Sequence, residues 1–113
     1  MADGSQWEIQ AAAWLHQHGL RLLQRNYRCR MGEIDLVMQD GDMLVFVEVR
    51  RRLHARFGGA AASIDWRKRH RIVLAARNYL SRLGRMPSCR FDVVAYEGDC
   101  RQPVWYRNAF QAE

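Results

Sequence analysis

The sequence predicts an α/β domain in which a central mixed five-stranded sheet is flanked by two main helices. Two segments with the helical spacing of apolar residues, near residues 5–18 and 64–83, are separated by runs typical of strands. The expected order is therefore α-β-β-β-α-β-β. A length of 113 residues predicts one domain, residues 1–113, with residues 1–4 disordered. About half of the residues are hydrophobic, which is enough for a core without disulfides.

The first helix is predicted over residues 5–18 and the first strand over residues 20–30. Ser5 is the expected N-cap, and Glu8 three residues later completes a capping box. Gly19 then ends the helix, because glycine readily adopts the left-handed conformation that follows many helices.

A hairpin is predicted next. Residues 33–39 alternate as a strand does. Ile34, Leu36 and Met38 are expected on one face, and Glu33, Asp35 and Val37 on the other. Asp40-Gly41 is a strong signal for a two-residue turn, and residues 43–50 form the partner strand.

This turn decides which acidic residues share a face. With Asp40-Gly41 as the turn, Asp35 lies opposite Phe46, and Glu33 lies opposite Glu48. Asp35 and Glu48 become diagonal neighbours on one face, about 7–8 Å apart between Cα atoms, and Arg50 shares that face. A three-residue turn would place the two acids on opposite faces.

The second half of the chain supplies a long helix and two strands. Residues 51–62 form a basic loop, and Ser63 is the expected cap of a helix over residues 64–83. The expected core stripe of that helix is Ile72, Ala76, Tyr79, Leu80 and Leu83. Strands are predicted at residues 89–96 and 104–107. Asp92 interrupts the first of these, so a structural partner is expected for it.

The charge of the chain favours a polyanionic partner. The formal net charge is +6, the isoelectric point is about 9.9, and Lys68 is the single lysine among 18 basic residues. The residues expected to contact nucleic acid are Arg50, Arg51, Arg52, Arg56, Arg67, Lys68 and Arg71. No aromatic platform is evident, since Trp66 and Trp105 are expected to be buried or half-buried. Shape recognition of DNA is therefore expected, and base readout is not.

The cysteines and the apolar pattern predict a cytoplasmic protein. Cys29, Cys89 and Cys100 are odd in number and lack zinc-site spacing, so they are expected to be reduced thiols. No signal peptide and no membrane span are expected, because the sequence contains neither a basic segment followed by an apolar run nor a long apolar stretch.

Acids set into two apolar strands predict a metal site. Carboxylates on one face repel each other, and Mg²⁺ or Mn²⁺ would remove the conflict. A neighbouring cation could then stabilise charge on a phosphate, which is a recipe for metal-dependent phosphodiester hydrolysis. The alternative is an exposed face on which Glu33, Asp35, Glu48 and Arg50 form surface ion pairs.

The motifs resemble those of one bacterial family. They are Gly32-Glu33-Ile34-Asp35-Leu36, Val45-Phe46-Val47-Glu48-Val49-Arg50, Arg90-Phe91-Asp92-Val93-Val94 and Asn108-Ala109-Phe110. Together they resemble the YraN family over residues 7–110. That family is similar to restriction-endonuclease-like proteins and to archaeal Holliday-junction resolvases, so the resemblance implies their fold.

The resemblance also implies roles for five residues. Asp35 and Glu48 fall on the metal ligands, and Glu8 falls on a helix glutamate that often joins them. Arg50 stands where the superfamily has a lysine, and Arg cannot lose its proton to act as a base. Lys68 matches a helix lysine of the family and is a candidate substitute for it. Glu8 remains open between a ligand and a capping residue, and Lys68 between a catalytic and a solvated residue.

The expected function is a Mg²⁺-dependent endonuclease that acts on DNA, with branched DNA among its substrates and a homodimer as one form. Arg50 at the lysine position keeps a non-catalytic nucleic-acid-binding module open as an alternative. A subunit that binds an acidic protein is a third.

Overall fold

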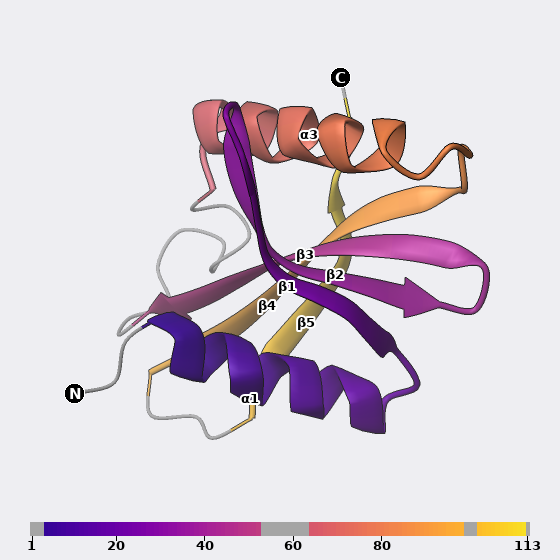
Figure 1. Cartoon of the computed structure of the whole chain (residues 1–113). Coiled ribbons are helices and arrows are strands. Elements are labelled where there is room, and N and C mark those ends of the chain that lie inside the picture. The colour runs from indigo at the N-terminus through magenta and orange to yellow at the C-terminus, as the bar shows by residue number, and fades with distance from the viewer. Residues whose placement is uncertain (1–3, 53–63, 99–101, 113) are drawn as a thin grey trace.

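The computed structural model describes residues 4–52, 64–98 and 102–112, and it has the predicted α/β order (Figure 1). The elements are α1 Gly4–Gln17, β1 Arg21–Cys29, β2 Gly32–Asp40, β3 Met43–Arg52, α3 Trp66–Ser81, β4 Cys89–Glu97 and β5 Val104–Phe110. The strands form one five-stranded sheet in the order β1-β2-β3-β4-β5. Only β3 and β4 are parallel, and the chain between them contains α3, so the sheet is mixed as predicted.

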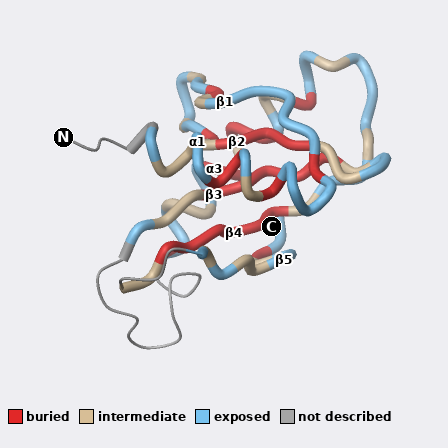
Figure 2. The backbone as a smooth tube through the Cα atoms, turned by 90° about the horizontal axis from the view of Figure 1, so that it is seen from below, coloured by how far each residue is buried: buried red, intermediate tan, exposed pale blue. Residues whose placement is uncertain are grey.

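The helices cover opposite faces of the sheet and divide the core in two (Figure 1). Under α1, Ala11 and Leu15 pack on Leu36, Val45 and Val47. The core stripe predicted for α3 is confirmed, with Val73 and Ala75 buried as well: Ile72, Val73, Ala75, Ala76 and Leu80 face Val37, Leu44, Phe46 and Phe91. The central strands are buried, whereas β1 is largely exposed at one edge (Figure 2).

Both helix starts differ from the prediction. Helix α1 begins at Gly4, so residue 4 is helical, and Ser5 lies inside the helix rather than at its N-cap. The side chain of Ser5 and residues 1–3 lie outside the described part. The N-cap of α3 is Asp65, whose carboxylate accepts a 2.9 Å hydrogen bond from the backbone N–H of Lys68. Ser63 lies outside the described residues; Ser and Asp cap about equally well, so the sequence alone does not choose between them.

The β2–β3 turn is one residue later than predicted. Asp40 pairs with Met43, so the turn residues are Gly41 and Asp42. Gly41 has φ +61°, which suits the first central position of a type II′ turn. Val37 therefore lies opposite Phe46 instead of Leu44. The register moves by two residues, an even number, so Leu36, Val37 and Met38 keep their predicted faces.

The expected alternation of β2 fails at Ile34. The ladder between β2 and β3 extends only as far as the Leu36–Val47 pair. Ile34 pairs with Tyr27 of β1 and joins the α3 side of the core, whereas Leu36 and Met38 lie on the α1 side. The strand leaves β3 at the position of Asp35, and this separation opens the space where the acidic residues meet.

The tip of the β1–β2 hairpin lies against α3 (Figure 1). A Cβ atom added to Gly32 would lie 2.7 Å from the backbone carbonyl oxygen of Arg71. Only glycine allows this approach, because the obstacle is backbone that cannot rotate away. Gly32 therefore allows the hairpin and the helix to approach each other closely at this point.

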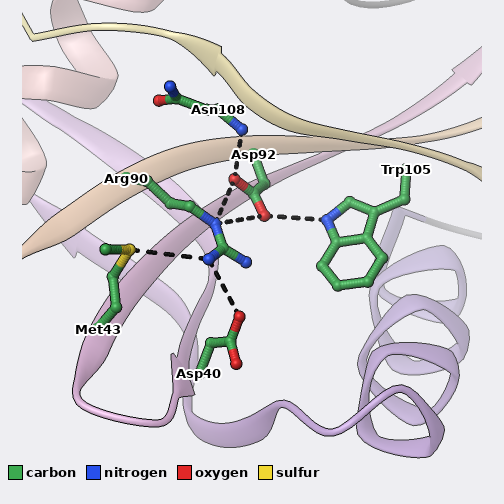
Figure 3. Close-up of polar contacts among 6 residues, drawn as sticks. All are labelled: Asp40, Met43, Arg90, Asp92, Trp105 and Asn108. Carbon is green, nitrogen blue, oxygen red and sulfur yellow. Dashed lines mark hydrogen bonds and ion pairs between the residues drawn. The ribbon is translucent and has the colours of Figure 1, made fainter.

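Asp92 has the structural partners that its buried position requires (Figure 3). It is 0% exposed, and its carboxylate accepts hydrogen bonds from Arg90 Nε at 3.0 and 3.1 Å, Trp105 Nε1 at 2.9 Å and the Asn108 backbone N–H at 2.9 Å. Arg90 also pairs with Asp40 at 3.0 Å. This network joins β4 to β5 and to the end of β2.

Trp105 is half-buried as predicted, but Trp66 is 71% exposed at the start of α3. The expectation that Trp66 is buried or half-buried is wrong. It begins a helix whose buried positions start at Ile72, so its side chain has no core to enter. Of the cysteines, Cys29 and Cys89 are free, and Cys100 lies outside the described residues. Within the described part of the chain, neither helix is long and apolar enough to cross a membrane.

Candidate functional site

Asp35 and Glu48 meet where β2 separates from β3. Asp35 Oδ2 accepts a 2.8 Å hydrogen bond from the backbone N–H of Val49, so the strand that leaves the ladder still supplies an acceptor to it. Glu48 is 6% exposed, and Asp35 is half-buried. The two side chains also interact with each other and line the same space, so the predicted meeting of these acids is confirmed. The alternative of surface ion pairs does not describe these two carboxylates.

Lys68 joins this group from the first turn of α3. Its Nζ atom lies 2.8 Å from Glu48 Oε1. Asp65 caps the first turn of α3 through the backbone N–H of Lys68, which fixes the lysine at the start of the helix. The single lysine of the chain is thus an ion-pair partner of the buried glutamate rather than a solvated residue.

Burial raises the pKa of both strand acids. For Asp35, burial is the largest cause, and the hydrogen bond from Val49 offsets part of it. For Glu48, burial and then the charge of Asp35 raise the pKa to about 7, and Lys68 offsets only part of this. Two carboxylates in one poorly solvated place resist losing both protons, unless further positive charge is brought in.

Glu8 reaches the same group from α1. Burial and then the charge of Asp35 raise its pKa to about 7. Its Oε1 atom is buried and receives no hydrogen bond from the described residues. The side chain therefore belongs electrostatically to the acidic group, as expected of a third ligand, whereas a capping bond with Ser5 lies outside the described side chains.

These side chains line a cleft of about 320 Å³. Its walls are Trp7, Glu8, Asp35, Glu48, Val49, Arg50, Arg51 and Lys68. The guanidinium of Arg51 lies over the ring of Trp7, 5.1 Å from its centroid. The cleft thus places acidic groups at its base and arginines beside them, as a site for a phosphate with a bound cation requires.

Three of the other residues expected at the site, Glu33, Arg67 and Arg71, do not line this cleft. Glu33 is exposed and pairs with Arg28 at 3.2 Å, so it is a neighbour of the acidic group. Arg67 is exposed, with its guanidinium 5.9 Å from the ring centroid of Trp66. Arg71 lines a second hollow. The side chain of Arg52 lies outside the described part, as do Arg56 and the rest of the basic loop.

Two arginines that the sequence did not single out also lie close by. Arg28 and Arg30, at the tip of the β1–β2 hairpin, line the second hollow, which shares Glu48 and Lys68 with the cleft. Their signal in the sequence is weak, because arginines on an edge strand are ordinarily solvated.

The donor set of the cleft fits a hard divalent cation. Among the described residues, no three acidic, histidine or cysteine side chains form a ready-made metal cluster. Mg²⁺, however, is commonly held by one or two carboxylates together with water and substrate phosphate. Asp35 and Glu48 are such a pair, and Glu8, with its buried, unbonded oxygen, lines the same cleft without forming a three-ligand cluster with them.

Fold and cleft together define a class of α/β protein in which a mixed sheet carries a buried Asp–Glu pair joined by a helix lysine. A family model described as "Uncharacterised protein family UPF0102" matches residues 7–96. A UPF0102 protein of Cupriavidus taiwanensis is 56% identical over 99% of this chain and 85% of its own length. One from Janthinobacterium sp. (strain Marseille) is 53% identical, with 96% and 87% covered. The chain belongs to the UPF0102 family, which is the YraN family that its motifs resemble.

The buried acids predict that the protein, kept free of divalent ions, loses stability as the pH rises. The pKa of Glu48 is about 7 in the folded chain against an ordinary 4.5, so between these values only the folded form keeps the proton. The stabilisation is complete below pH 4.5 and is lost as the pH passes about 7, with a contribution on the order of 2 kcal/mol. Urea unfolding with a chelator, at about pH 5 and pH 8, measures it. Glu48→Gln should remove the part of this pH dependence that Glu48 contributes and leave the parts from Glu8 and Asp35, whose pKa values are also raised. An unchanged slope in that variant would contradict the assignment.

Proposed function

We propose that this protein is a metal-dependent phosphodiesterase that cuts DNA. The observation that carries the proposal is the meeting of Asp35, Glu48 and Lys68 from three separate elements, with Lys68 Nζ 2.8 Å from Glu48. Placing two poorly solvated acids beside each other costs stability, and such a cost is common at functional sites. Structural ion pairs also occur in proteins, but this one lines an open cleft of about 320 Å³.

Asp35 and Glu48, with Glu8 beside them, would hold Mg²⁺ or Mn²⁺. When bound, such an ion supplies positive charge for a phosphate oxygen and lowers the pKa of a water molecule. Val49 keeps the Asp35 carboxylate in one orientation through its N–H, so the acid is positioned before any ligand arrives.

Lys68 would stabilise the negative charge that develops on the phosphate. It takes the part that the related nucleases give to a lysine two residues after the strand glutamate, the position that Arg50 occupies here. The location of Lys68 beside Glu48 supports this substitution, because the required charge can come from a helix as well as from a strand. Arg50, which also lines the cleft, would hold the phosphate as a cation.

The net charge of +6 and the arginines around the cleft support a nucleic-acid substrate. The resemblance to junction resolvases adds branched DNA to the proposal. A junction has two strands to cut, so its cleavage would involve two copies of the chain.

Cleavage assays test this proposal. End-labelled single strands, linear duplexes and four-way junctions are incubated with Mg²⁺, Mn²⁺ or EDTA. Cleavage is expected with either metal, with the junction preferred, and none with EDTA. Salt-sensitive binding without any cleavage would replace the enzyme by a non-catalytic DNA-binding module. Absence of both would exclude nucleic acid and favour an acidic protein partner.

A further inference from the structure

A second hollow of about 430 Å³ adjoins the cleft. It lies between the tip of the β1–β2 hairpin and α3, the two segments that Figure 1 shows side by side. Glu48 and Lys68 line both spaces, so their ion pair forms the wall that the two share. A chain molecule bound in one space can therefore continue into the other.

The walls of this hollow are rich in cations. Four of its ten lining residues are basic, namely Arg28, Arg30, Lys68 and Arg71, and two are acidic, namely Glu33 and Glu48. Each acid already has a basic partner, Arg28 for Glu33 and Lys68 for Glu48. The two remaining cations, Arg30 and Arg71, form no ion pair with any carboxylate in the described part of the chain.

The two walls approach each other closely at Gly32, and the arginines remain exposed. A side chain at position 32 would collide with the carbonyl of Arg71, so this approach requires glycine there. Arg30 comes from the hairpin and Arg71 from the helix, and both side chains are exposed. Each of the two walls of the hollow therefore carries one exposed arginine.

We propose that this hollow binds the DNA backbone next to the phosphate held in the cleft, with Arg30 and Arg71 contacting flanking phosphates. The inference rests on the proposed function for its ligand. Arginine suits this task, because its planar guanidinium offers two parallel hydrogen bonds to a phosphate. These contacts are with DNA phosphates only. They would contribute to affinity and to the position of the DNA, and they would not distinguish one base sequence from another.

Paired charge reversal tests the inference. The variant Arg30→Glu with Arg71→Glu is compared with Arg82→Glu with Arg85→Glu, which makes the same charge change at exposed sites just after α3 that do not line the hollow. Affinity for a labelled duplex is measured by fluorescence anisotropy in EDTA, over about 50–300 mM salt. The first variant should lose at least about 10-fold in affinity, and its salt slope should shrink by about two.

The control pair should lose much less affinity and keep the native salt slope. Equal losses in the two variants would show that only net charge matters and would overturn the inference. The milder pair Arg30→Ala and Arg71→Ala, checked by its melting temperature, covers the case in which charge reversal disturbs folding. It should show the same reduction of the salt slope, and a native slope in this folded pair would also overturn the inference.

The cysteines provide an independent measurement in the native protein. Cys29 lines the hollow, whereas Cys89 is exposed and does not. Bound DNA should slow alkylation of Cys29, measured by mass spectrometry, and leave Cys89 unchanged. Equal rates at Cys29 with and without saturating DNA would count against occupancy of the hollow.

The outcomes separate this inference from the proposed nuclease activity. Binding is measured in EDTA and does not depend on cleavage. Loss of affinity in the Arg30 and Arg71 variant of a protein that never cuts DNA would keep the backbone site and reject the enzyme. If the native protein cuts DNA with metal but its Arg30 and Arg71 variant binds like the control pair, the enzyme is kept and the backbone site is rejected.

Discussion

Replacement of Asp35 by Asn should slow metal-dependent cleavage by more than about 10³-fold, which corresponds to about 4 kcal/mol of barrier. The variant removes the charge that a divalent cation needs. It keeps an oxygen that can accept the hydrogen bond from Val49, so the local fold should persist. Affinity for DNA in EDTA should stay within about twofold of the native value or increase, because a negative charge has left the cleft. Single-turnover cleavage and anisotropy measure the two effects separately.

Glu33→Gln is the matched control for this variant. It makes the same change from acid to amide two residues earlier on β2, at an exposed side chain paired with Arg28. Its single-turnover cleavage rate at saturating DNA should remain within about threefold of the native rate, because Glu33 lines the second hollow and not the cleft. A comparable loss in both variants would mean that Glu33 is a ligand, and native activity in Asp35→Asn would move the active site elsewhere.

Replacement of Asp92 by Ala should destabilise the fold by about 3–5 kcal/mol. The carboxylate is fully buried and accepts bonds from Arg90, Trp105 and the backbone of Asn108. Removing it leaves these donors without their acceptor and leaves the partly buried Arg90 with Asp40 alone. Urea unfolding followed by tryptophan fluorescence measures the loss of stability.

Arg28→Ala is the control for that loss, because it breaks an exposed ion pair and should cost less than about 1 kcal/mol. DNA binding by folded Asp92→Ala protein should be unaffected, since Asp92 lines neither the cleft nor the second hollow. A loss of stability no larger than that of the control would show that the network in Figure 3 adds little to the fold.

The sequence predicts the order of elements and the meeting of Asp35 and Glu48, because both follow from local periodicity. The faces of Leu36, Val37 and Met38 survived an error in the turn, since moving the register by two residues preserves alternation. The position of Ile34 could not be predicted in this way. It depends on where β2 leaves β3, which is a property of the packed sheet.

The partner of Glu48 illustrates the same limit. Lys68 is twenty residues further along the chain, and only the packing of α3 on the sheet brings it within 2.8 Å. Residue type and family pattern named it as a candidate, but distance decided between a solvated and a paired lysine. Arg30 had no comparable signal, because its neighbour Arg71 comes from a different element and nothing local joins them.

The close approach of the hairpin to α3 at Gly32 separates shape from charge in this protein. The approach depends on a residue without a side chain, while the charge of the hollow comes from other residues, Arg30 and Arg71 among them. Substitutions among those arginines can therefore tune how strongly a polyanion is held without rebuilding the space that holds it. Gly32 itself cannot be substituted in this way. Affinity for a polyanion can therefore change through the arginines while the backbone around Gly32 stays the same.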